Sequence, residues 1–132
     1  MLKKPADYIC ELSKTSSAND KKKILTDAFT NGCFDLFVGL RLAYNPLVSF
    51  GVKKIPIIDQ IDDGYCNKSF TEFLVLANDL RLRKLSGNAA RKAIDDFANE
   101  ASIHEWNNFY RLVLGKDVKA GVTSTTVNNV LN

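Results

Sequence analysis

The sequence predicts an all-α protein, and three observations support that fold class. Apolar residues recur at spacings of three and four along most of the chain. Strand-like alternation of apolar and polar residues is almost absent. Residues that typically cap the start of a helix precede most of the apolar runs. Several runs are followed by a glycine or by a residue that precedes proline, and both are signals for the end of a helix. We therefore expect a compact bundle of about six to seven helices.

Chain length and composition predict one domain. The 132 residues fit a single globular core, and 45% hydrophobic with 25% charged residues is ordinary for a folded soluble protein. The chain has no apolar run long enough to span a membrane, and the residues after Met1 lead into an amphipathic stretch instead of a signal peptide. We expect one helical domain over residues 1–132, an intracellular location and no membrane partner.

The first half of the chain predicts three helices, each with an apolar stripe. Asn19 or Asp20 is expected to cap the second of them. Gly32 is expected to end it in the left-handed conformation. Asn45 should end the third, because the following Pro46 disfavours helical geometry in the residue before it. The expected ranges are about 6–14, 20–31 and 33–44.

The second half begins with an irregular stretch, residues 47–68, in which one short helix is expected near Val48–Lys53, followed by an exposed loop. Ser69 and Glu72 then have the spacing of a capping box and open the longest periodic run. This run should form a helix that ends at Ser86 and Gly87. Asn88 is expected to cap the next helix, from 89 to about 101, and a further helix should run from 103 to Gly115. A final helix is expected after Gly121, capped by Thr123 or Ser124.

Charge is segregated along this second half. The net charge of +3 is too small to indicate a nucleic-acid binder, because affinity for phosphate depends on where the charge lies. Residues 93–105 carry four acidic residues and no Lys or Arg, whereas all the charged residues of the preceding stretch, 81–92, are basic. Its five basic residues are Arg81, Arg83, Lys84, Arg91 and Lys92. Two solvated helix faces of opposite sign would give the same pattern, so the asymmetry does not decide the function.

Catalytic and metal-binding patterns are missing from the sequence. His104 is the only histidine, which excludes a multi-histidine metal site, and we expect it to be a helix-surface residue. The three cysteines never form a C-x-x-C pair. The adjacent carboxylates 62–63 and 95–96 point apart on a helix or loop. No phosphate-binding, dinucleotide-binding or zinc-protease motif is present. We expect no catalytic residue, no metal and no enzymatic activity.

Two segments combine a glycine turn, hydroxyl or amide side chains and flanking cations at an expected helix start. Such a start exposes backbone N–H groups that can hold a phosphate. An ordinary helix end followed by an ordinary helix start has the same composition, and that alternative stays open at each turn. The candidate residues of the first segment are Lys84, Ser86, Gly87, Asn88 and Arg91. Those of the second are Lys116, Lys119, Gly121, Val122, Thr123 and Ser124.

These segments resemble the N-terminal domain of the ATP-dependent DNA ligases of T-even phages. The two clearest matches are residues 84–90, which begin Lys84-Leu85-Ser86-Gly87, and residues 116–122, which begin Lys116-Asp117-Val118-Lys119. Further matches lie at residues 41–44, 52–56 and 127–130. The resemblance covers residues 37–131, and residues 1–36 match only in helical pattern and position. In that family the domain is a helical module that binds the minor groove around a nick through backbone amides and basic residues at helix starts.

The resemblance implies sequence-independent binding of nicked duplex DNA. It points to Lys119, Gly121, Val122 and Thr123 as contacts, together with Lys84, Ser86, Gly87 and Asn88. The implied partners are nicked double-stranded DNA and the catalytic domains of the same ligase. The implied setting is DNA replication, repair and recombination by a bacteriophage, in the cytoplasm of the host.

The adenylated Lys-x-Asp-Gly motif of that family is missing here. The nearest string, Ile61-Asp62-Asp63-Gly64, lacks the lysine. The nucleotidyltransferase and OB domains are therefore expected to be absent from this chain, which looks like an excised domain. The resemblance implies that ATP and Mg belong to the full-length ligase and that this domain holds no cofactor.

A protein-interaction module is the alternative function. The loop from Ile55 to Tyr65 is hydrophobic and bears aspartates. It could recruit the ligase to a sliding clamp or another replication protein. The two functions can coexist in one domain.

Overall fold

The computed structural model describes residues 4–52, 55–59 and 68–116. Every regular element in these ranges is helical, which confirms the all-α class. The helix expected after Gly121 lies outside them. The elements are α1 (Pro5–Ser13), α2 (Ala18–Thr30), α3 (Phe34–Tyr44), α4 (Phe70–Arg81), α5 (Gly87–Glu100), α6 (Ile103–Glu105), the π-helical η1 (Trp106–Tyr110) and α7 (Arg111–Leu114). None of the described helices is both long and apolar enough to cross a bilayer.

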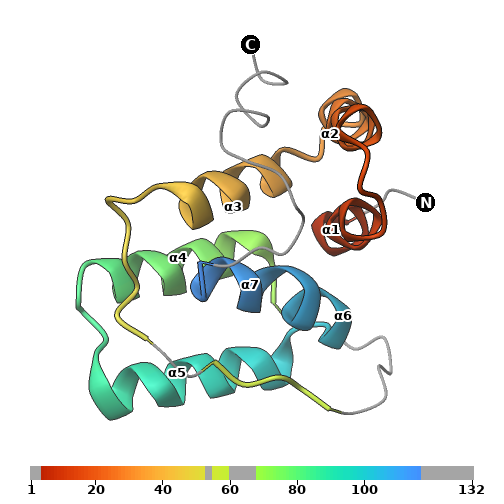
Figure 1. Ribbon diagram of the computed structural model, residues 1–132. Helices are drawn as coiled ribbons and strands as arrows, with labels where there is room; N and C mark the ends of the chain where they lie inside the picture. Colours follow the sequence, from red (N-terminus) through yellow and green to blue (C-terminus); the bar gives the residue numbers. More distant parts are fainter. Residues whose placement is uncertain (1–3, 53–54, 60–67, 117–132) are drawn as a thin grey trace.

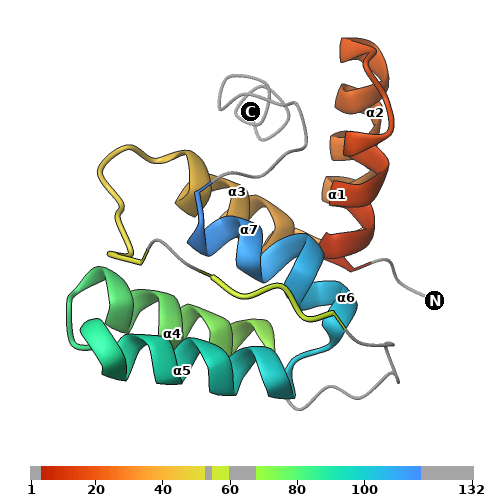
Figure 2. The ribbon, with the colours of Figure 1, turned by 60° about the horizontal axis from the view of Figure 1, so that its bottom comes forward.

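The last three elements follow one another without a break and form the central helix of the molecule. This helix contacts α1 through η1 and α3 through α7. Figures 1 and 2 show α4 and α5 as an antiparallel pair joined by a turn at the left, with α1 and α2 at the opposite end, and in Figure 2 the pair lies below the central helix. Helices α1 and α3 therefore bury apolar residues directly against the central helix, and α2 packs onto α1 and α3.

An aromatic cluster fills this centre. Trp106 and Phe73 are fully buried, and Phe97 and Tyr110 are nearly so. The rings of Phe73 and Tyr110 stack with centroids 4.5 Å apart, and the Phe97 ring meets Tyr110 edge-on at 5.5 Å. Each such pair contributes about 0.5–1.5 kcal/mol beyond the area it buries. The π-helical turn changes the residue spacing, and Trp106, Phe109 and Tyr110 are all buried on it.

The start of α2 differs from the prediction. The helix begins at Ala18, and Ser17 caps it in place of Asn19 or Asp20: the Ser17 Oγ accepts a hydrogen bond from the Asp20 amide at 3.4 Å. Several residues between 15 and 20 are competent caps, so the local pattern could not choose among them. The predicted end is confirmed, because the helix stops beside Gly32, which has φ +78°.

The stretch after α3 also corrects a prediction. Asn45 ends α3 as expected, but residues 45–52 contain no helix, so the short helix near Val48–Lys53 does not form in the described part of that range. The Val48 amide instead donates to the Asn45 carbonyl at 3.1 Å, closing a turn. Val48 and Phe50 are both buried. Their apolar character reflects the packing of a loop onto the core.

The longest predicted helix is too long. Helix α4 ends at Arg81 because Arg83 adopts a left-handed conformation with φ +62°. The amides of Lys84 and Leu85 both donate to the Asp79 carbonyl, at 2.9 and 3.2 Å, which closes the helix end. The next helix starts at Gly87 with Ser86 in the capping position, so the assignment of Asn88 as the cap was wrong.

The close approach of α3 to α7 depends on Gly39. A Cβ added there would lie 2.5 Å from the Phe109 ring and 3.3 Å from the Val113 side chain. Because Phe109 is fully buried, its ring has nowhere to move. We predict that Gly39→Ala lowers the free energy of unfolding by about 1–3 kcal/mol in urea denaturation.

The matched control is Gly115→Ala, at the end of α7. A Cβ there would make only ordinary van der Waals contacts, the shortest of them 3.4 Å to the Arg111 carbonyl oxygen, and the residue has an ordinary helical φ. Its stability should stay near that of the parent protein. Equal losses in both variants would contradict the packing explanation.

Because the Glu105 carboxyl is buried, we expect the stability of the fold to depend on pH. Its side chain is buried beside α1, and burial raises the pKa of the carboxyl above its usual value, although the charges of Lys4 and His104 oppose this. A carboxyl whose pKa is raised by folding stabilises the fold only while protonated, so ionisation costs stability once the pH rises through the folded-state pKa. Glu105→Gln should therefore raise Tm at pH 8, and the gain should shrink below about pH 4.3, the usual pKa of glutamate. A Tm difference that is constant across this range would contradict the account.

Candidate nucleic-acid interface

The first candidate segment forms the turn between α4 and α5. Figures 1 and 2 both place this turn at the left end of the molecule, beside the loop that follows α3. All five of its candidate residues are exposed: Lys84, Ser86, Gly87, Asn88 and Arg91. The structure therefore brings them together on one accessible surface.

The start of α5 is open toward solvent. Ser86 has an extended backbone, and its side chain accepts no hydrogen bond from the first turn. That turn also contains no acidic residue, whereas the first turns of α1, α2 and α4 each contain one. The backbone N–H groups and the helix dipole thus leave a positive potential here that no side chain of the turn neutralises.

Gly87 allows this opening. Its φ of +56° lies in the left-handed region, where side chains other than glycine are strained. A Cβ at this position would meet nothing within 4 Å. Backbone conformation, and not packing, therefore requires the glycine, and the side of the residue where a Cβ would stand is open.

Two cations of this segment are available to a ligand. Lys92 pairs with Asp96 at 3.2 Å, and Arg81 donates to the Asn78 side chain at 2.8 Å. Within the described residues, no ion pair or hydrogen bond engages the side chains of Lys84 and Arg91. Arg81 and Lys92 of the basic stretch thus already have partners within the domain.

Lys116 is the one residue of the second candidate segment that the structure describes. Its ammonium group donates to the carbonyls of Asn45 and Val48, and burial lowers the pKa of its side chain. It therefore ties the end of α7 to the loop after α3, and a DNA contact from it stays a prediction. The remaining candidates lie outside the described residues: Lys119, Gly121, Val122, Thr123 and Ser124.

Arg83, just before the candidate residues of the first segment, also bonds to the loop after α3. Its guanidinium donates to the Ser49 carbonyl at 3.2 Å and to the Ser49 hydroxyl at 3.3 Å. It also lies over Gly51, where a Cβ would come within 2.6 Å of its Nη1. Residues 45–51, called here the bridging loop, thus receive one cation from each candidate segment. Sequence reasoning missed both ties, because they join residues far apart in the chain.

Residues 55–59, which belong to no helix, are held against η1 by hydrogen bonds. The Trp106 indole donates to the Pro56 carbonyl at 2.8 Å. The Asn107 amide group both accepts from the Ile58 N–H and donates to the Ile58 carbonyl, each at 2.9 Å. Ile57 is left 64% exposed. This stretch is the described part of the alternative protein-interaction loop, whose residues 60–65 lie outside the described ranges.

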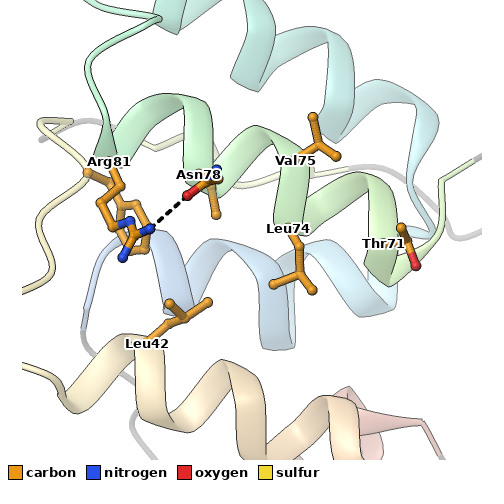
Figure 3. A pocket seen from close by; sticks show the side chains of 8 residues that line it. Leu42, Thr71, Leu74, Val75, Asn78 and Arg81 are labelled. Carbon is orange, nitrogen blue, oxygen red and sulfur yellow. Dashed lines mark hydrogen bonds between the residues drawn. The ribbon is translucent and has the colours of Figure 1, made fainter.

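An open hollow of about 380 Å³ lies between the end of α3 and the outer face of α4. Figure 3 shows Leu74 and Val75 of α4 and Leu42 of α3 around it, with Arg81 at one end held by Asn78. Its lining includes no carboxylate, histidine or cysteine. Among the described residues, no group of three or more metal-ligating side chains comes together.

Comparison with known structures relates the chain to a ligase. It superposes over 98% of its length on the solved structure Pmar-Lig_PreS3, with a TM-score of 0.91 and 40% sequence identity, and the structure Pmar-Lig_Pre gives the same values. The chain spans only 29% of the length of each. No family model and no curated protein matches it. The all-helical fold thus recurs as one part of a larger ligase-related protein, which confirms at this level the relationship that the sequence indicated.

Proposed function

We propose that this chain is the DNA-binding domain of an ATP-dependent DNA ligase of the phage type. It holds nicked duplex DNA through phosphate and minor-groove contacts, without reading the sequence. One observation carries the proposal: the α4–α5 turn and the end of α7 are tied to the same bridging loop, by Arg83 and Lys116. The α4–α5 turn would hold one phosphate backbone of the duplex, and the segment that follows Lys116 in the sequence is proposed to bind the other.

The chemistry of the α4–α5 turn supports this proposal. An uncapped helix start, with Lys84 before it and Arg91 one turn into it, offers amides and charge to a phosphate. These groups contact the DNA backbone and not the base edges, so they carry no sequence information. Each neutralised phosphate releases counterions, and binding should therefore weaken steeply as salt rises.

The proposal includes a division of labour within a longer ligase. The chain spans 29% of the ligase-related structures, so such proteins contain further domains. The catalytic nucleotidyltransferase and OB domains would be partners of this domain and would use ATP and Mg. DNA replication, repair and recombination of a bacteriophage, in the host cytoplasm, would be the setting.

Charge reversal at the turn tests the proposal. In fluorescence anisotropy with a nicked duplex, Lys84→Glu and Arg91→Glu should each weaken binding on the order of tenfold and reduce the slope of log K against log salt by about 1. Lys119→Glu, on the second turn, should act in the same way. The losses should be equal for duplexes of different sequence.

Lys22→Glu is the matched control. Lys22 is an exposed lysine on α2, at the opposite end of the molecule from the turn (Figure 1). The Lys22→Glu variant changes the net charge as much as Lys84→Glu does, and it should have little effect on the slope of log K against log salt. If Lys22→Glu weakens binding as much as Lys84→Glu, net charge and not this face governs binding, and the site assignment is wrong.

Recruitment of the ligase by a replication protein such as a sliding clamp is the second candidate function. The observation that favours it is the exposure of Ile57 on a stretch that Trp106 and Asn107 hold in place. An exposed apolar residue that is already held in place loses little conformational entropy when a partner binds it. Capture of a clamp that survives nuclease and moderate salt would support this role.

A further inference from the structure

Two residues with a left-handed backbone face each other between the bridging loop and the α4–α5 turn. Gly51 has φ +69°, and Arg83 has φ +62°. Among the non-glycine residues that the structure describes, only Arg83 and Lys116 have a positive φ, and both donate to the bridging loop. This conformation costs free energy in a residue with a Cβ, and such strain is concentrated at functional sites. The strain at Arg83 is therefore a starting point for a hypothesis of function.

Gly51 makes room for the Arg83 guanidinium. A Cβ at residue 51 would lie 2.6 Å from the Nη1 of Arg83 and 2.8 Å from its Cζ. The guanidinium donates to the Ser49 carbonyl and hydroxyl, at 3.2 and 3.3 Å, and to the Leu80 carbonyl at 2.9 Å. It thus joins the bridging loop to the last turn of α4. We call Ser49, Gly51 and Arg83 the Arg83 clasp.

The Arg83 clasp sets the path of the chain into the α4–α5 turn. All three of its residues are exposed, and hydrogen bonds between exposed groups compete with water, so the clasp adds little to the stability of the fold. Its local effect is larger. The amide of Lys84, the next residue along the chain, folds back onto the Asp79 carbonyl at 2.9 Å. The position of Arg83 therefore determines where Lys84 and the start of α5 lie.

We propose that Arg83 is a positioning residue for DNA binding. It holds the α4–α5 turn in the conformation that binds phosphate, and it does not itself contact the DNA. This inference rests on the proposed DNA-binding function. Three hydrogen bonds already direct the guanidinium toward acceptors within the protein. Without the clasp the turn samples other conformations, and the apparent affinity falls in proportion to the fraction of molecules that remain competent to bind.

Gly51→Ala tests the clasp without removing a charge, because the added methyl group displaces the guanidinium from Ser49. If about a tenth of the molecules keep the competent turn, a nicked duplex should bind the whole chain roughly tenfold more weakly in anisotropy titrations. The slope of log K against log salt should be unchanged, since the same cations reach the DNA. Gly32→Ala is the matched control. Gly32 has φ +78°, but a Cβ there meets nothing within 4 Å, so this variant should bind as the parent does.

Arg83→Gly is the second variant, and it keeps the test decisive if Gly51→Ala fails to fold. Glycine adopts a left-handed backbone without strain, so Arg83→Gly removes the clasp and keeps the turn of the chain. It should also bind roughly tenfold more weakly, with an unchanged salt slope. In the double variant the alanine at position 51 has no guanidinium to displace. It should therefore bind no more weakly than Arg83→Gly alone.

The outcomes separate this inference from the function on which it rests. If Gly51→Ala and Arg83→Gly bind as tightly as the parent while Lys84→Glu binds weakly, the clasp is refuted and the proposed function stands. A salt slope that falls by about 1 in Arg83→Gly would show a direct phosphate contact and would also overturn the inference. Additive losses in the double variant, or equal losses in Gly51→Ala and Gly32→Ala, would do the same. If the parent protein binds no duplex at all, both proposals fail.

Discussion

The donation of hydrogen bonds from Arg83 and Lys116 to the bridging loop is the interaction on which the geometry of the candidate interface depends. A loop without secondary structure has few backbone partners for its carbonyl groups, and a buried carbonyl must find a partner elsewhere. Here two cationic side chains from distant parts of the chain donate to the carbonyls of Asn45, Ser49 and the buried Val48. The same bonds hold the α4–α5 turn and the end of α7 beside one loop. A structural constraint therefore also sets the geometry of the candidate interface.

The central helix makes this arrangement possible. Its aromatic residues form the core, and Gly39 lets α3 pack closely against Phe109. That packing brings the end of α3 near the end of α7, where Lys116 can reach Asn45. The same helix holds residues 55–59 through Trp106 and Asn107. The interface and the alternative interaction stretch are thus both supported by one rigid element.

The sequence predicted what local patterns determine. Apolar spacing located the helices, and the signals at Gly32 and Asn45 gave correct ends. The end of α4 was missed because Arg83, a residue that rarely adopts a left-handed conformation, does so to reach Ser49, 34 residues away. The exposed α4–α5 turn was predictable from its glycine and cations. The roles of Arg83 and Lys116 were not, because a hydrogen bond between distant segments leaves no local pattern.

The central claim is that the α4–α5 turn and the adjacent bridging loop form one DNA-binding face. Amide chemical shifts followed by NMR during titration with a nicked duplex test it most directly. We expect the largest changes together, at residues 45–51 and at 84–91, with little change on α2 or at residues 55–59. Changes concentrated on α2 or at 55–59, with the bridging loop and the α4–α5 turn unaffected, would contradict the account.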